Sequence, residues 1–173
     1  MTLLGVVLAG GQSTRFGRDK ACALYAGKAL LDHAKDSLAP HVDCLVVVGR
    51  DWPGLLRVED LPRPGLGPLG GLYGALSWGA AQGYDAVLSC GCDTLGLTAA
   101  HIGALTPGPA VLDALPIIGL WPTRLAPVLG DWLALNDRHS VYAFGQAVGA
   151  RRAVVPDPPR NINQPDDLLA PPA

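Results

Sequence analysis

The stretch Leu3-Leu4-Gly5-Val6-Val7-Leu8-Ala9-Gly10-Gly11 decides the fold of this chain. Its first seven residues form a nearly continuous apolar run of strand length, which is typical of a strand buried on both faces of a parallel sheet. Two adjacent glycines end the run, and glycine lets the backbone turn sharply and lets a ligand approach its N–H groups. The sequence therefore predicts a buried strand that leads directly into a ligand-binding loop.

Three cations follow the glycines: Arg15, Arg18 and Lys20. A planar guanidinium can bind two phosphate oxygens at once, and a lysine ammonium acts as a compact point charge. We predict that this loop holds the phosphates of a nucleotide. Arg18 could equally be a solvated loop charge, and the neighbouring Asp19 could either orient Lys20 or cap the loop.

Two common phosphate-binding patterns are absent from this loop. The Walker pattern requires G-x-x-x-x-G-K-[ST], but Phe16 stands five residues after Gly11, and Arg18 follows Gly17. The dinucleotide pattern G-x-G-x-x-G also fails, because neither Gly10 nor Gly11 has a glycine two residues later. A P-loop NTPase is excluded, and hydride transfer loses its main support.

Apolar periodicity predicts strands that alternate with helices along the chain. The expected strands are 3–9, 44–48, 55–59, 85–90, 110–112, 117–121 and 152–155; the expected helices are 29–38, 69–81, 98–105 and 125–135, one capped by Ser140 and one beginning near Pro165. This alternation predicts a single Rossmann-like α/β domain over residues 1–173, with three layers and a mostly parallel sheet.

Composition limits the possible functions. The formal charge of −2 and the pI of about 6.0 argue against a nucleic-acid partner, which usually requires a broad basic surface. The chain shows neither a secretion signal nor a run of about 20 apolar residues, so we expect a cytoplasmic protein with no membrane segment. The four cysteines are expected to be free thiols rather than disulfide or metal ligands, because they lack a paired C-x-x-C spacing; they are Cys22, Cys44, Cys90 and Cys92.

A carboxylate follows a second buried strand. Asp93 comes shortly after the apolar run that ends at Cys90, and ligands of open α/β sheets bind beyond the carboxyl ends of the strands. Asp93 and Gly10 could therefore face one ligand. On the residues alone, Asp93 could bind Mg²⁺ through oxygen or could cap a local turn.

The pattern L-A-G-G-x-S-x-R-x-G-x-D-K over residues 8–20 resembles the nucleotidyltransferase family that contains molybdenum cofactor guanylyltransferase. Further similarities occur in the same order as in that family and extend over nearly the whole chain. They are Val58-Glu59-Asp60, Gly67-Pro68-Leu69-Gly70-Gly71-Leu72, Cys90-Gly91-Cys92-Asp93-Thr94 and Asn161-Ile162-Asn163-Gln164-Pro165-Asp166-Asp167-Leu168.

The resemblance implies a nucleotidyltransferase fold and a defined reaction. GMP would pass from GTP to the terminal phosphate of molybdenum-molybdopterin, giving the guanine dinucleotide cofactor and pyrophosphate. Proteins that insert molybdenum or receive the cofactor would be partners. Gly10 would favour guanine, because the relative that transfers CMP carries alanine at this position.

The resemblance also implies the site residues. Catalytic roles fall to Lys20, Arg15 and Asp93, with Asp93 holding Mg²⁺ or Mn²⁺. The nucleotide would contact Leu8, Ala9, Gly10, Gly11, Lys20, Asp60 and Asp93, and the acceptor would contact Arg138, Asn161 and Asn163. Asp166 and Asp167 are assigned to the first turn of a helix, outside the site.

One departure from the family and two other functions stay open. The family has a nucleotide-contacting asparagine after the second strand, where this chain has Gly49, so the backbone or Arg50 would have to substitute. The chain could be a related nucleotidyltransferase that uses CTP or another phosphorylated acceptor. It could also be a non-catalytic protein that delivers molybdenum cofactor.

Overall fold

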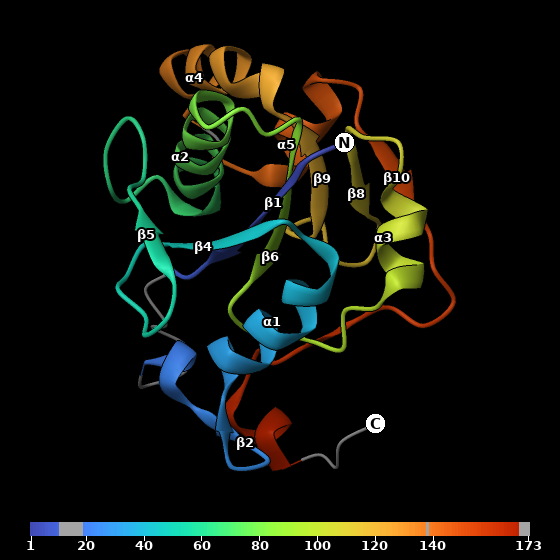
Figure 1. Cartoon of the computed structure of the whole chain (residues 1–173). Coiled ribbons are helices and arrows are strands. Elements are labelled where there is room, and N and C mark those ends of the chain that lie inside the picture. Colours follow the sequence, from blue (N-terminus) through green and yellow to red (C-terminus); the bar gives the residue numbers. More distant parts are fainter. Residues whose placement is uncertain (11–18, 138, 170–173) are drawn as a thin grey trace.

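A seven-stranded sheet forms the centre of the computed structural model, which describes residues 1–10, 19–137 and 139–169 (Figure 1). The strand order is β10-β8-β9-β6-β1-β4-β5. β9 runs antiparallel to β6 and β8, and the other neighbouring pairs are parallel. Their bounds are β1 (Leu3–Leu8), β4 (Cys44–Val48), β5 (Leu56–Val58), β6 (Ala86–Gly91), β8 (Ala110–Leu112), β9 (Gly119–Pro122) and β10 (Arg151–Ala153). The predicted mostly parallel α/β fold is confirmed.

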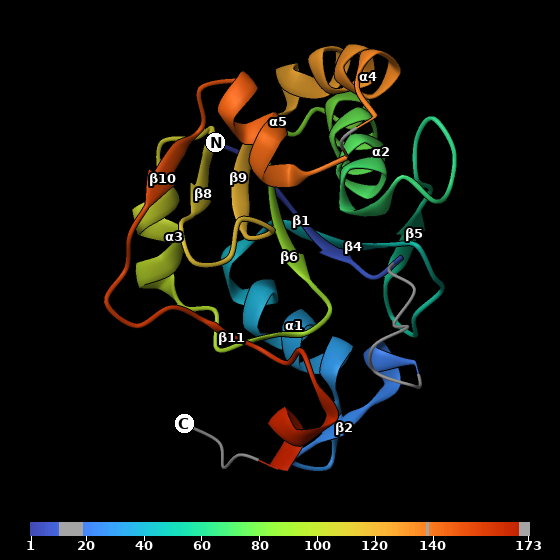
Figure 2. The same cartoon turned by 180° about the vertical axis from the view of Figure 1, so that it is seen from behind.

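Helices cover both faces of this sheet (Figures 1 and 2). α1 (Leu30–Leu38) and α3 (Ala99–Leu105) lie on one face, and α2 (Gly67–Ala81), α4 (Ala126–Leu135) and α5 (Val141–Ala147) lie on the other. Alternate residues of β1 join different cores: Val6 and Leu8 pack with α2, whereas Val7 packs with α1. Burial on both faces explains why β1 is apolar throughout.

The helix boundaries follow the predicted signals closely. Thr98 and His101 form a capping box at the start of α3, and the Ser140 hydroxyl accepts a hydrogen bond from the Ala143 N–H at the start of α5. Short 3₁₀ turns occupy η1 (Lys20–Cys22), η2 (Ala39–His41), η3 (Thr123–Leu125) and η4 (Pro165–Leu169). None of the helices in the described ranges is both long and apolar enough to cross a membrane.

The strand predictions differ from the structure mainly at strand ends. β9 starts at Gly119 rather than 117, because a turn in which the Ile118 N–H donates to Leu115 O occupies the preceding residues. Two short antiparallel pairs were not predicted: β2 (Leu24–Tyr25) with β3 (Lys28–Ala29), and β7 (Thr94–Leu95) with β11 (Arg160–Asn161). Two residues are too few for strand periodicity, so these pairs leave no pattern in the sequence.

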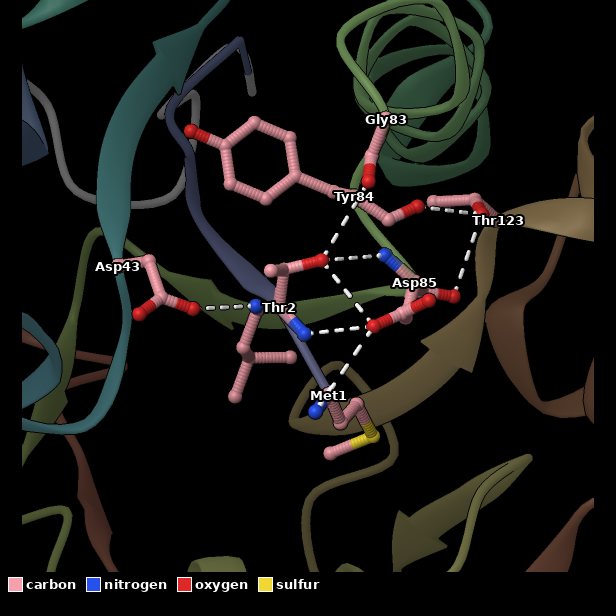
Figure 3. Close-up of polar contacts among 8 residues, drawn as sticks. Met1, Thr2, Asp43, Gly83, Tyr84, Asp85 and Thr123 are labelled. Carbon is pink, nitrogen blue, oxygen red and sulfur yellow. Dashed lines mark hydrogen bonds and ion pairs between the residues drawn. The ribbon is translucent and has the colours of Figure 1, made fainter.

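Polar contacts join β1 to its neighbours at the amino ends of the parallel strands (Figure 3). The Thr2 N–H donates to Asp85 Oδ2 at 2.6 Å, and the Thr2 hydroxyl donates to the same oxygen at 3.1 Å. The Leu3 N–H donates to Asp43 Oδ2 at 2.7 Å, and the Thr123 hydroxyl donates to Tyr84 O at 2.8 Å. The contacts of Thr2 and Leu3 fix the start of β1, and the Thr123 contact joins η3 to the residues before β6, all at the end of the sheet opposite to the predicted site.

Candidate active site

A pocket of about 240 Å³ opens at the carboxyl ends of β1, β4 and β6. Six residues predicted to bind the nucleotide line it: Leu8, Ala9, Gly10, Lys20, Asp60 and Asp93. Three other predicted site residues, Gly11, Arg15 and Arg138, lie outside the described residues. The parallel strands bring the ends of β1 and β6 together, as the topology predicts.

Lys20 and Asp93 meet in this pocket although 73 positions separate them in the sequence. The Lys20 Nζ lies 2.5 Å from Asp93 Oδ2, and the two side chains are 15% and 17% exposed. Lys20 belongs to η1, whereas Asp93 follows β6 after a turn. An ion pair this sheltered from water is stronger than a surface pair, so it keeps the ammonium directed toward the pocket.

The short β7–β11 ladder brings Asn161 to Asp93. Asn161 pairs with Thr94, and the Ile162 N–H donates to Asp93 O at 3.1 Å. With its amide nitrogen turned toward the carboxylate, Asn161 donates to Asp93 Oδ1 at 2.7 Å and to Oδ2 at 3.2 Å. The amide must take this orientation, because a carboxylate can only accept hydrogen bonds. Asn161 therefore orients Asp93 in the described structure, and its predicted acceptor contact stays a prediction.

Asn163 lies beside Asn161, with 2.8 Å between the two amide groups. Asp167 fixes the backbone here, because its Oδ2 accepts from the N–H groups of Asn163 at 2.7 Å and Gln164 at 2.8 Å. These backbone hydrogen bonds lower the pKa of Asp167. Asp167 therefore stabilises the turn that carries Asn163, in agreement with its assignment outside the site.

Asp60 is a half-buried carboxylate that faces the pocket between β5 and α2. Burial raises its pKa, and no described side chain forms an ion pair or donates a hydrogen bond to it. Methyl groups built on Gly10 and Gly71 would lie 3.6–3.9 Å from its carboxylate oxygens. Asp60 is thus a desolvated acceptor at the pocket wall, available for N–H donors of a ligand.

The backbones of Gly49 and Gly10 touch beneath the pocket. Gly49 has a φ of +91°, and a Cβ on this residue would lie 2.2 Å from Gly10 Cα. No side chain fits at position 49 in this arrangement, so the asparagine of the family has no equivalent there. Arg50 lines the pocket instead: its Nε donates to Ala9 O at 3.1 Å and its Nη1 to Asp19 Oδ2 at 2.6 Å.

The residues around Asp93 fit a magnesium ion that is held largely by its substrate. No group of three or more His, Cys, Asp or Glu side chains within the described ranges could enclose a metal. Mg²⁺ does not need such a cage, because it is commonly bound by one or two carboxylates together with substrate phosphates and water. The Asp93 carboxylate is a ligand of the appropriate hard type, and the amide groups of Asn161 and Asn163 lie next to it.

All four cysteines are free thiols in this structure. Cys92 lines the pocket, and burial raises its pKa to about 12. Cys90 is fully buried in the core, and burial raises its pKa as well. Thiols are nucleophilic only as thiolates, so neither cysteine is activated for chemistry or oxidation near neutral pH.

The chain is similar to known nucleotidyltransferases in sequence and in fold. The family model described as "MobA-like NTP transferase domain" matches residues 5–142. A molybdenum cofactor guanylyltransferase from Cereibacter sphaeroides is 35% identical over 185 residues, which cover 97% of this chain and 94% of that protein. Sequence similarity therefore extends through β1, β6 and the segment that carries Asn161.

Two solved structures share the fold. Molybdopterin-guanine dinucleotide biosynthesis protein A from Archaeoglobus fulgidus has a TM-score of 0.70 and 17% identity, with 97% of this chain and 95% of that chain covered. The 2-C-methyl-D-erythritol 4-phosphate cytidylyltransferase from Thermus thermophilus has a TM-score of 0.63 and 15% identity, with 98% and 95% covered. At these identities, the likeness concerns the fold alone.

Proposed function

Because this chain belongs to the MobA-like NTP transferase family, we propose that it transfers GMP from GTP to the terminal phosphate of molybdenum-molybdopterin. The observation that carries the proposal is the 2.5 Å contact between Lys20 and Asp93 at the carboxyl ends of parallel strands. A cation for phosphate and a carboxylate for a metal are the two groups that such a transfer requires.

The reaction is an in-line substitution at the α-phosphorus of GTP. An oxygen of the acceptor's terminal phosphate forms the new P–O bond, and pyrophosphate leaves with the electron pair of the bond that breaks. Negative charge accumulates on the α-phosphate and on the leaving group, so catalysis consists mainly of positioning and charge neutralisation. Lys20 supplies one positive charge, and Arg15 is predicted from the sequence to supply a second. No covalent enzyme intermediate is needed.

Mg²⁺ would be held by Asp93 with the triphosphate, and when bound it would neutralise phosphate charge and stabilise the departing pyrophosphate. Asn161 holds the Asp93 carboxylate in place through its amide. Lys20 remains close to Asp93, so the ammonium is directed toward phosphates that bind beside the carboxylate. Asn163, and Arg138 from sequence alone, are proposed to contact the phosphate of the acceptor.

Selection of guanine is assigned to Asp60 and Gly10. Guanine carries neighbouring N–H donors at N1 and N2, which suit a desolvated carboxylate acceptor, whereas cytosine offers only its N4 amino group. A methyl group added at Gly10 would lie 3.3 Å from Gly49 Cα and 3.8 Å from Asp60 Oδ1. The absence of that methyl group leaves space for the larger base beside Asp60.

A nucleotide specificity assay, with GTP and CTP supplied separately, tests this function. The protein is incubated with Mg²⁺, molybdenum-molybdopterin and either GTP or CTP, and pyrophosphate and the dinucleotide product are measured. We expect turnover with GTP and a shift of the GTP-to-CTP ratio toward CTP in Gly10→Ala. Turnover with CTP alone would indicate a cytidylyltransferase, and cofactor binding without turnover would indicate a delivery protein.

A further inference from the structure

Arg50 connects two segments that are far apart in the sequence. Its Nε donates to Ala9 O at 3.1 Å, and its Nη1 donates to Asp19 Oδ2 at 2.6 Å. The Arg50 side chain is 23% exposed and that of Asp19 is 47% exposed, so the bond to Ala9 is partly buried whereas the bond to Asp19 is open to water. Ala9 follows β1 directly and Asp19 precedes Lys20, so one guanidinium links the carboxyl end of β1 to the start of η1.

Asp19 connects Arg50 to the backbone of η1, the short turn that contains Lys20. Asp19 Oδ1 accepts from the Ala21 N–H at 3.2 Å and thereby caps η1, while Oδ2 accepts from Arg50. The hydrogen bond from Arg50 lowers the pKa of Asp19, so the carboxylate stays charged near neutral pH. At its other end, Lys20 reaches Asp93 through its ammonium. Both the backbone and the side chain of Lys20 are therefore held.

We propose that Arg50 is a positioning residue that holds Lys20 in place by bridging the carbonyl of Ala9 and the carboxylate of Asp19. The proposal rests on the proposed GMP transfer, in which Lys20 must lie beside the α-phosphate. It also assigns a role to a residue next to Gly49, where the family asparagine is missing. The Nε and Nη1 groups of Arg50 both donate to protein groups, so the role that we assign to it is to position Lys20.

Substitution by lysine separates positioning from charge. Lysine keeps the positive charge of Arg50 but presents a single ammonium, which cannot reproduce a fork that reaches two acceptors in different directions. If Arg50 positions Lys20, Arg50→Lys should lose almost as much activity as Arg50→Met. If Arg50 instead bound phosphate through its charge, Arg50→Lys would retain much of the function, and Asp19→Asn would free the guanidinium and improve GTP binding.

Steady-state kinetics of Arg50→Lys, Arg50→Met, Asp19→Asn and the Asp19→Asn/Arg50→Met double variant test the proposal. A small displacement of a catalytic group costs up to about 100-fold in rate, so we expect kcat to fall by about 10- to 100-fold in each. The KM for GTP should change by less than about 3-fold, because the loss of an interaction that acts only in the transition state lowers kcat and leaves KM nearly unchanged. The double variant should be no worse than the poorer single variant, because the residues act as a unit.

Arg57→Met is the matched control. Arg57 lies on β5 and pairs with Glu59 at 3.0 Å and with Asp51 at 3.4 Å, outside the pocket lining. Its kcat and KM should equal those of the unmodified protein. Circular dichroism of every variant establishes that the fold is kept, and Asp19→Asn provides a nearly isosteric test if Arg50→Met does not fold.

A measurement that does not depend on turnover follows Lys20 itself. Amine labelling with an acylating reagent, quantified by mass spectrometry, should rise several-fold at Lys20 in Arg50→Met and Asp19→Asn, because the ammonium leaves its sheltered position. Lys35, which pairs with Asp32 on α1, should be labelled equally in all variants. If the unmodified protein fails to transfer GMP, the proposed function fails, while this labelling still decides whether Arg50 positions Lys20.

Three kinetic results would overturn the proposal. Arg50→Lys could keep the full kcat, the loss in Arg50→Met could fall on the KM for GTP alone, or the effects of Asp19→Asn and Arg50→Met could multiply in the double variant. Unchanged labelling of Lys20 would equally contradict it.

Discussion

At the scale of single residues, the position of Lys20 depends on one local turn and one contact that is distant in sequence. Asp19 caps the short turn that begins at Lys20, and the Lys20 ammonium donates a hydrogen bond to Asp93 across the pocket. The sequence predicted Lys20 from the cations of the loop, Asp93 from its place after a buried strand together with the family resemblance, and Asp60 from the resemblance alone. Their mutual contacts depend on strand order, and Asn161 joins Asp93 through a ladder of only two residue pairs.

Asp93→Asn should abolish most of the activity and keep the fold. The change removes the carboxylate that faces Lys20 and that we propose as the charged oxygen ligand for Mg²⁺, and loss of one such stabilising group typically costs at least about 100-fold in kcat. Pyrophosphate release measures the rate, and circular dichroism measures the fold. Asp113→Asn is the control, because Asp113 pairs with the exposed Arg152 outside the pocket lining. Full turnover by Asp93→Asn would remove Asp93 from the mechanism.

Asp60→Asn should make the protein more stable and less able to use GTP. Burial raises the pKa of Asp60 above its ordinary value of 3.8, so its charged form destabilises the fold. The stabilisation by asparagine should therefore be full above that raised pKa and should disappear as the pH falls below about 4. Thermal unfolding at pH 7 and in acid measures it. A lower Tm than that of the unmodified protein at pH 7 would contradict the assignment.

At the scale of elements, the glycine-rich helix α2 determines how closely one layer approaches the site. Gly74 lies where a Cβ would be 2.0 Å from Glu59 O, directly before Asp60. The helix therefore packs against the backbone that carries Asp60. The sequence predicted a helix over 69–81, but it did not identify which backbone the helix contacts.

Gly74→Ala and Gly103→Ala should change stability in opposite directions. The methyl group at Gly74 must displace backbone, and overpacking of this kind costs about 1–3 kcal/mol. Gly103 lies in α3 with nothing within 4 Å of its Cβ position, so alanine there should add about 0.5–1 kcal/mol through helix propensity. Urea unfolding measures both free energies. Equal effects of the two substitutions would show that packing at Gly74 is not decisive.

At the scale of the whole molecule, the carboxyl ends and the amino ends of the parallel strands differ in what they contact. The carboxyl ends of β1, β4 and β6 form the pocket, whereas the amino ends are fixed by the contacts of Thr2, Asp43 and Asp85 (Figure 3). The contacts at the amino ends are thus separated from the groups that we propose to bind ligand. We expect mutations at one end to leave the other end unchanged.

Asp85→Asn should lower the free energy of unfolding at neutral pH and should make that free energy less dependent on pH in the acid range. The hydrogen bonds from the Thr2 N–H and hydroxyl lower the pKa of Asp85 below 3.8. A carboxylate with a lowered pKa stabilises the fold above its unfolded-state pKa, and this contribution is lost as the pH falls through the folded-state pKa. Urea unfolding between pH 7 and pH 3 should therefore show the two proteins converging in acid. A constant difference across this range would contradict the linkage.

The sequence by itself determined the layered fold, the strand that leads into the predicted phosphate loop, and the chemical types of Lys20, Asp60 and Asp93. These features are local, because periodicity, glycine turns and charge can be read from neighbouring residues. Only the tertiary structure decided that Lys20 contacts Asp93, that Asn161 orients this carboxylate, and that Arg50 bridges Ala9 and Asp19. These contacts join positions 31 to 73 residues apart, and strand order and β-ladder register, which leave no periodic signal in the chain, bring them together.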